Sequence, residues 1–143
     1  MMRLWSASLI AIATLSCAPA GPAMVFDTSA GVTRVRVEVA DTPAARERGL
    51  MGRARLDADA GMAFVWDEDT SGPFWMKDTL IPLSVAFVDG GGRVVRILDM
   101  EPCRADPCPS YDPRTTYRAA VEVNRGTFER LGVRVGDRAR LVR

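Results

Sequence analysis

Histidine is missing from this 143-residue sequence, and its absence excludes several classes of active site. Catalysis by a serine–histidine–aspartate or a cysteine–histidine group needs the imidazole ring as a base, so neither arrangement is possible here. Histidine metal ligands are excluded as well, and the cysteines are too few to complete a structural zinc site by themselves. We therefore expect the protein to use no metal and no cofactor.

The sequence also lacks an excess of charge of either sign. It has 19 lysine and arginine residues against 18 aspartate and glutamate residues, which gives a formal net charge of +1, and these charges are spread along the chain. Proteins that bind nucleic acid or an anionic membrane surface usually carry a basic block. We therefore expect no nucleic-acid partner. The length suits one domain with a core of its own.

Long apolar runs are absent except at the N-terminus. Residues 4–16 contain no charged side chain and follow Arg3, which is typical of a signal peptide. This run is shorter than the roughly 20 apolar residues that a membrane-spanning helix needs. We therefore predict that the protein is exported and is periplasmic or extracellular.

Cys17 stands where the apolar run ends, and residues 15–17 resemble a lipoprotein box. Residues 1–17 are therefore predicted to be a signal peptide that ends at a lipidation cysteine, so that membrane contact comes only through an N-terminal lipid. The small residues 18–20 leave an alternative open, in which an ordinary signal peptidase cleaves there and releases a free protein.

Cys103 and Cys108 are the two cysteines outside the predicted leader, and both lie in a proline-rich segment. In an oxidising compartment such a pair is expected to form a disulfide. A metal site would need further ligands, and a redox site usually has the shorter Cys-X-X-Cys spacing. A structural disulfide is the interpretation that we prefer.

The hydrophobic pattern predicts a single compact domain over residues 31–143, preceded by a flexible tether over residues 18–30 that is rich in alanine, proline and glycine. Alternating or continuous apolar segments predict strands, and a glycine-rich turn at residues 89–93 predicts a hairpin. The fold class is therefore α+β, mainly antiparallel β, as a curled sheet or small barrel with two short helices. The expected strands are 34–39, 61–66, 83–88, 94–98, 117–123 and 139–142, and the expected helices are 43–50 and 127–131.

Three stretches of the sequence together resemble a widespread prokaryotic family, the domain of unknown function (DUF) 192. They are residues 46–53 (RERGLMGR), residues 61–62 with 74–83 (GM and FWMKDTLIPL), and residues 122–128 (EVNRGTF). The family usually has asparagine where this chain has Asp78, and a small residue in place of Arg125. The resemblance implies a compact, mainly β fold in exported or membrane-anchored proteins, and it implies no established activity.

Lys77 is the only lysine in a chain that has 18 arginines, which suggests that its position requires a compact ammonium group. One interpretation is a binding or catalytic lysine; the other is a lysine that extends from the protein surface and pairs with Asp78 or Glu122. The adjacent Phe74, Trp75 and Met76 cannot all be buried on one face of a strand. We expect the first and third of them in the core, and leave open whether Trp75 is an exposed platform for a sugar or a peptide.

Arg46, Arg48 and Arg53 surround the first expected helix. They can bind a carboxylate or a phosphate through two parallel hydrogen bonds. The interpretation that we prefer is that they brace the fold by pairing with acids such as Asp78, Glu122 or Asp137. Glu122 and Asp78 can also form a carboxylate pair of the glycosidase type, but the sequence does not give their separation.

Taken together, these patterns favour a small binding or interaction module of the cell envelope, whose partner is an unknown envelope ligand or protein. One alternative is an enzyme that uses Lys77 as an acid, base or nucleophile, and another is a purely structural interaction domain. The residues expected to line the groove of a binding module are Arg46, Arg48, Trp75, Lys77, Asp78 and Glu122.

Overall fold

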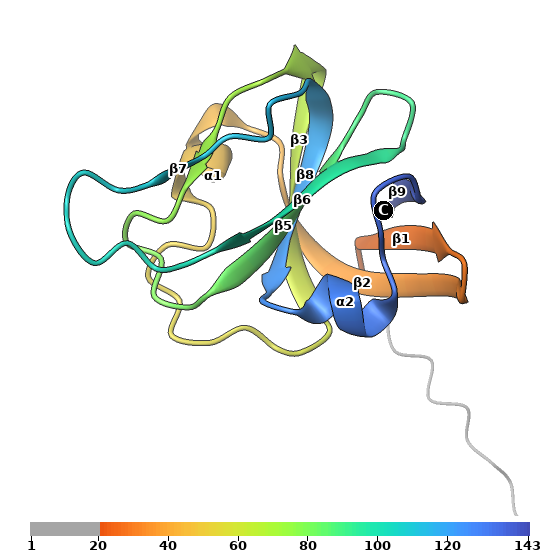
Figure 1. Ribbon diagram of the computed structural model, residues 1–143, viewed down its shortest axis with the longest axis horizontal. Helices are drawn as coiled ribbons and strands as arrows, with labels where there is room; N and C mark the ends of the chain where they lie inside the picture. Colours follow the sequence, from red (N-terminus) through yellow and green to blue (C-terminus); the bar gives the residue numbers. More distant parts are fainter. Residues whose placement is uncertain (1–20) are drawn as a thin grey trace, which may run out of the picture.

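A curled seven-stranded sheet that forms a half-barrel dominates the computed structural model, which describes residues 21–143 (Figure 1). Neighbouring strands are antiparallel except for one parallel pair, β2 and β3. The predicted α+β class with a curled, mainly antiparallel sheet is therefore confirmed. In their order across the sheet the strands are β6 (Val94–Met100), β5 (Leu83–Val88), β8 (Tyr117–Asn124), β3 (Ala60–Thr70), β2 (Gly31–Ala40), β1 (Ala23–Thr28) and β9 (Arg138–Val142).

The remaining elements are short and lie on the two sides of this sheet. Helix α1 (Pro43–Arg48) and a small second sheet, made of β4 (Phe74–Trp75) and β7 (Ser110–Tyr111), lie on one side. Helix α2 (Thr127–Leu131) lies on the other side, near β1 and β9 (Figure 1). No helix within residues 21–143 has both the length and the apolar character that a bilayer crossing requires.

Strand β1 corrects the predicted start of the domain. Residues 23–28, which composition assigned to the tether, pair with both β2 and β9. Met24 and Phe26 alternate along this strand and are fully buried, so the segment belongs to the sheet because its apolar side chains fill the core. The predicted signal peptide of residues 1–17, the lipidation of Cys17 and the first residues of the tether lie outside the described residues.

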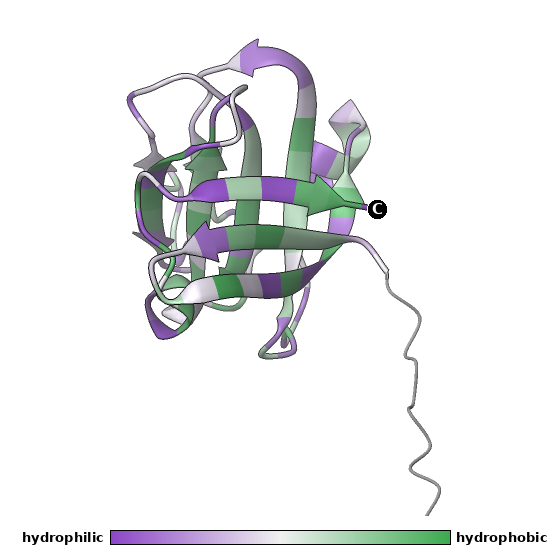
Figure 2. Ribbon diagram, turned by 90° about the vertical axis from the view of Figure 1, so that its right-hand side faces the viewer, coloured by the Kyte–Doolittle hydropathy of each residue, from purple (hydrophilic) through white to green (hydrophobic). Residues whose placement is uncertain are grey.

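The first and last strands of the sheet approach each other because the sheet curls. The Ala139 amide donates to the Gly92 carbonyl at 2.8 Å, and the Val94 amide donates to the Asp137 carbonyl at 2.9 Å. Hydrophilic and hydrophobic residues alternate along β9, the strand that ends near the C-terminus (Figure 2). One side of this strand therefore faces the solvent and the other faces the core.

The two faces of the sheet carry separate apolar cores. Inside the curl, Phe26 and Phe128 pack edge to face with ring centroids 5.9 Å apart, and Phe128 anchors α2. On the outer face, Phe74 lies edge-on to Phe64 and Phe87, with centroids 5.2 Å and 5.3 Å away. Strand β5 is buried along its whole length because it contributes to both cores. The segments that cover the outer face leave part of it accessible, and this is where the candidate site lies.

Candidate functional site

Glu122 is buried in the middle of the sheet. Its neighbours across the sheet are Met62 in β3 and Val85 in β5, so the strand register places its side chain on the outer face between two apolar side chains. The residue is 4% exposed. Burial alone raises the pKa of its carboxyl to about 8, with no contribution from a hydrogen bond or a neighbouring charge. The carboxyl is therefore mostly protonated at neutral pH.

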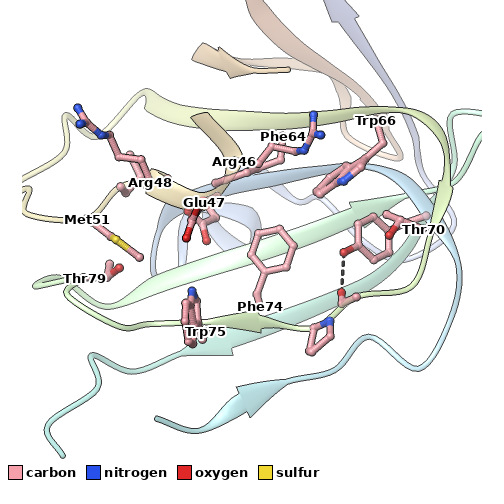
Figure 3. A pocket seen from close by; sticks show the side chains of 16 residues that line it. Arg46, Glu47, Arg48, Met51, Phe64, Trp66, Thr70, Phe74, Trp75 and Thr79 are labelled. Atoms are coloured by element: carbon pink, nitrogen blue, oxygen red, sulfur yellow. Dashed lines mark hydrogen bonds between the residues drawn. The ribbon is translucent and has the colours of Figure 1, made fainter. Parts of the chain in front are cut away.

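A recess of about 300 Å³ opens over this part of the sheet. Figure 3 shows the α1 side chains on one side of the hollow and Phe74 and Trp75 on the opposite side. The wall combines apolar and aromatic side chains with a comparable share of charged and hydroxyl groups. The residues that line the recess are Arg46, Glu47, Arg48, Gly49, Leu50, Met51, Phe64, Trp66, Thr70, Gly72, Pro73, Phe74, Trp75, Thr79, Tyr117 and Glu122.

Helix α1 places its last residues at the edge of the recess. Thr42 caps the helix by accepting a hydrogen bond from the Ala45 amide at 3.2 Å, and Pro43 occupies its first turn. Gly49 ends the helix with a φ of 48°, a conformation that a side chain would strain. A Cβ atom at this position would also lie 3.3 Å from the Phe64 ring, so glycine lets the helix approach the sheet closely.

Arg46 is fixed at one end of the recess. Its guanidinium Nη1–H donates to the Val65 carbonyl at 2.8 Å, and the group lies 5.1 Å from the centroid of the Trp66 ring. Behind Trp66, the Tyr117 hydroxyl donates to the Gly72 carbonyl at 2.6 Å. Burial, together with the charge of Asp112, raises the pKa of Tyr117 to about 12.

Trp75 separates the recess from a second hollow of about 680 Å³, which Lys77 and Asp78 line. Trp75 is 52% exposed, whereas Met76 is 1% exposed and Phe74 packs against the core, as predicted. The Lys77 ammonium lies 5.7 Å from the centroid of the Trp75 ring. None of the ion pairs within residues 21–143 includes Lys77, so the structure does not support the interpretation in which Lys77 pairs with Asp78 or Glu122.

Asp78 has an unusual backbone conformation, and it does not line the recess that contains Glu122. Its φ is 53°, in the left-handed region that asparagine and aspartate tolerate better than most residues. This accounts for an aspartate in place of the asparagine usual in the resembled family. The Asp78 carbonyl accepts from the Gly52 amide at 2.8 Å, and the residue lines the second hollow. The two carboxyl groups therefore do not share one recess, and no glycosidase-type pair is formed between them.

Of the three arginines that were expected to brace the fold, only Arg53 forms an ion pair within residues 21–143, and its partner is not one of the acids named for it. Arg53 pairs with Glu38 of β2, where Nη2 lies 2.6 Å from the carboxylate, and this lowers the pKa of Glu38. The carboxylate of Asp137 accepts from the Arg134 amide instead. The contact of Asp137 with Arg134 is local, whereas Arg53 and Glu38 are 15 residues apart and meet only in the folded protein, so sequence patterns do not reveal this ion pair.

Cys103 and Cys108 form a disulfide whose Cα atoms are 5.4 Å apart. Asp106 lies close to both sulfur atoms. Bonded sulfurs are not thiolates, so this group does not provide the ligand set that a zinc ion requires. The Cys103 amide donates to the Met76 carbonyl at 3.3 Å, which ties this loop to the segment that carries Trp75 and Lys77.

Sequence reasoning did not identify several residues of the recess. Phe64, Trp66 and Tyr117 lie in segments that were interpreted as core strands. The period-two pattern places Phe64 and Trp66 on the face of Glu122 only once the register is known, whereas Tyr117 reaches this face because the pairing of β3 with β8 shifts register between Val65 and Thr70. Glu47 lies between the two helix arginines and lines both hollows. Its place in the RERGLMGR stretch, between Arg46 and Arg48, is the sequence signal that could have indicated it.

Comparison with known proteins finds a matching family and solved structures that are similar to this chain. The sequence model of the DUF192 family, described as "Uncharacterized ACR", matches residues 24–141. A proposed transcription regulator from Sinorhizobium meliloti 1021 is 33% identical with a TM-score of 0.77, and the match covers 85% of this chain and 93% of that one. A protein of unknown function from Novosphingobium aromaticivorans DSM 12444 is 30% identical with a TM-score of 0.76, covering 82% and 83%. No functionally curated protein matches the sequence.

Proposed function

Since the chain belongs to the DUF192 family, for which no activity is defined, we propose from its site that it is a ligand-binding module whose pocket is the recess over Glu122. In this proposal a small organic ligand enters between α1 and the Phe74–Trp75 segment and meets the Glu122 carboxyl at the sheet. The second hollow, beyond Trp75, receives any part of the ligand that extends outward.

The burial of Glu122 without a partner is the observation that supports this proposal. A carboxyl held among apolar side chains with no protein hydrogen bond costs free energy of folding, and its oxygens reach the recess, because no fully buried side-chain oxygen or nitrogen within residues 21–143 lacks a partner. A leucine at this position would pack against Met62 and Val85 without that cost. Ionisable groups with strongly shifted pKa values inside a cleft are a common feature of functional sites. A ligand group that bonds to the carboxyl would supply the missing partner.

The composition of the recess agrees with binding of a small molecule. Such pockets combine apolar and aromatic surface with polar groups that fix the orientation of the ligand, and the polar share of this recess is larger than is usual for them. Phe74 and Trp75 provide the aromatic surface here, while Thr79, Arg46 and Glu122 provide the polar groups. This favours a binding pocket over a flat surface that contacts another protein.

We propose that the protein acts outside the cytoplasm. The charge pattern of residues 1–17 supports export, and a disulfide between Cys103 and Cys108 is stable in an oxidising compartment. The name of the Sinorhizobium relative suggests a role in transcription, but we do not extend this to the present chain. Its net charge is +1, and arginines such as Arg36, Arg118 and Arg140 are paired with acids.

The proposal is tested with the variant Glu122→Leu and four probes: phenylacetate, phenylacetamide, glucuronate and glucose. We expect at least one probe to shift the indole N–H signals of Trp66 and Trp75 in the wild-type protein. The leucine variant should lose this response and should be more stable than wild type at pH 7.5 by ~1–3 kcal/mol, because an apolar side chain replaces a buried ionisable one.

The matched control is Glu68→Leu, which changes an exposed glutamate of β3 and should leave probe binding unchanged. The proposal fails if no probe shifts these signals, or if Glu122→Leu binds the probes as well as wild type does.

A further inference from the structure

We infer that the ligand of this pocket carries a single carboxylate, which Arg46 binds beside Trp66 with help from Arg48. This inference rests on the proposed function and specifies the class of ligand. It uses the positions and charges of the polar groups that line the recess.

Arg46 differs from the other arginines within residues 21–143 in combining burial with the lack of an acidic partner. Only Arg46 and Arg53 are half-buried among them, and Arg53 pairs with Glu38. Arg46 forms no ion pair within the same residues. A guanidinium that is partly removed from water gains from an anionic partner, and a ligand carboxylate supplies one.

The orientation of Arg46 is fixed before any ligand arrives. The Val65 carbonyl holds one N–H of the guanidinium at 2.8 Å, and the Trp66 ring supports the planar group from 5.1 Å. Its other N–H donors remain free to bind a ligand in the recess that the residue lines. A group held in this way loses little conformational freedom on binding, which favours a planar, two-oxygen partner such as a carboxylate.

The charge balance of the recess favours a monoanion. Arg46 and Arg48 contribute two positive charges, Glu47 contributes one negative charge, and Glu122 is mostly protonated at neutral pH. The net charge is therefore close to +1, which matches one carboxylate better than a phosphate dianion. The protonated Glu122 can also donate a hydrogen bond to an oxygen of the ligand.

Ionisation of Glu122 would place a second negative charge in the same recess. The charged or titratable groups that face it are Arg46, Glu47 and Arg48 from α1 and Tyr117 from its own strand. Strand β3 and the segment from Phe74 to Thr79 contribute only aromatic, apolar and hydroxyl groups to the recess. Tyr117 stays neutral in this range because its pKa is about 12. Carboxylate binding should therefore weaken as the pH rises above about 8.

The test compares each acid with its neutral counterpart: phenylacetate with phenylacetamide, and glucuronate with glucose. At pH 6.5, titrations followed by NMR should show the acid of at least one pair binding about 10-fold more tightly than its counterpart, since charge-assisted hydrogen bonds are the stronger kind. The two pairs distinguish an aromatic acid from a sugar acid as the source of the carboxylate.

Two arginine variants test whether Arg46 causes the preference for the acid over its neutral counterpart. In Arg46→Gln the advantage of the acid should fall below about 3-fold, and in the exposed Arg48→Gln it should fall by about 3-fold with unchanged melting. The matched control is Arg140→Gln, whose arginine pairs with Asp27 on β1, and it should keep the full preference. In wild type the affinity for the acid should drop above pH 8, and in Glu122→Gln it should not.

Two results separate this inference from the proposed function. If acid and neutral counterpart bind equally tightly in the recess, the carboxylate inference is wrong and the pocket remains. If none of the four probes perturbs the recess, both are wrong. Retention of the full acid preference in both arginine variants would also overturn the inference.

Discussion

Glu122 has a pKa of about 8 because two apolar neighbours, Met62 and Val85, replace water around its carboxyl. The folded protein therefore holds a proton that the unfolded chain releases at a much lower pH. This difference couples the stability of the fold to pH through one side chain. The same carboxyl is the polar group at the sheet end of the proposed pocket, so its ionisation connects stability with binding.

The free energy of unfolding should therefore depend on the ionisation of Glu122. Between pH 4.5, the ordinary pKa, and pH about 8, the unfolded chain has lost this proton and the folded chain has kept it. Rising pH therefore favours the unfolded state over this range, by up to ~1.4 kcal/mol per pH unit. Glu122→Gln lacks this pH dependence. Urea unfolding at several pH values should therefore show the variant becoming more stable relative to wild type as the pH rises from 4.5 to about 8. Parallel profiles for the two proteins would contradict the prediction.

At the scale of elements, the pairing of β3 with β8 positions the recess. Gly61 of β3 lies opposite Val123 of β8, and a Cβ atom on it would lie 2.4 Å from the carbonyl oxygen of Glu122. Such a contact is too short for any side chain. The two strands can therefore hold their register, and present Glu122 beside Met62, only with glycine at position 61.

Replacement of Gly61 should disrupt this pairing. We expect Gly61→Ala to destabilise the protein by ~3 kcal/mol or more, because the backbone of β8 must move to accept the methyl group. Chemical denaturation measures the change. Gly21→Ala is the matched control, since a Cβ atom there meets nothing within 4 Å, and it should be nearly neutral. Equal stability of the two variants would show that the β3–β8 spacing is not constrained.

Short sequence patterns predicted the parts of the fold that depend only on neighbouring residues. The hairpin of β5 and β6 followed from its glycine-rich turn, where Asp89 Oδ1 accepts from the amides of Gly91 and Arg93 at 2.9 Å each. Trp75 was correctly singled out because three large apolar residues in a row cannot share one face. Strand β1 was missed because the alanine, proline and glycine before it dominated the composition of residues 18–30.

The recess could not be predicted because its walls come from distant segments. Arg46 in α1, Trp66 in β3 and Glu122 in β8 meet only through the sheet order β8-β3-β2 and the return of the chain over the outer face. The parallel pairing of β2 with β3 is a long-range choice that no sequence period specifies. The sequence therefore indicated Glu122 as a candidate without indicating which residues surround it.

At the scale of the whole molecule, the two sides of the sheet have different roles. The inner core, which includes Phe26 and Phe128, closes the curl of the half-barrel. The outer core is covered by α1, by the small sheet of β4 and β7 and by the loop that the Cys103–Cys108 disulfide closes, and this cover leaves the recess open. A variant in the recess can therefore change binding while the inner core stays intact.

The predicted lipidation of Cys17 can be tested in cells that produce the protein. If Cys17 is lipidated, the wild-type protein should be found in the membrane fraction of the producing cells, and Cys17→Ser should move it to the soluble fraction. Each CH₂ group of an acyl chain that is buried in the bilayer contributes to membrane affinity, so loss of the lipid should weaken membrane binding strongly. Cell fractionation with detection of a C-terminal tag measures this. Identical partitioning of the two proteins would exclude a lipid on this cysteine.

The environment of Glu122 is tested most directly by a pH titration of its side-chain carboxyl, followed through its ¹³C NMR signal in the folded protein. We expect a midpoint near 8, because Glu122 is buried and its carboxyl lacks a protein partner. A midpoint near 4.5, the ordinary value, would mean that the carboxyl is solvated or paired and would contradict the proposed site.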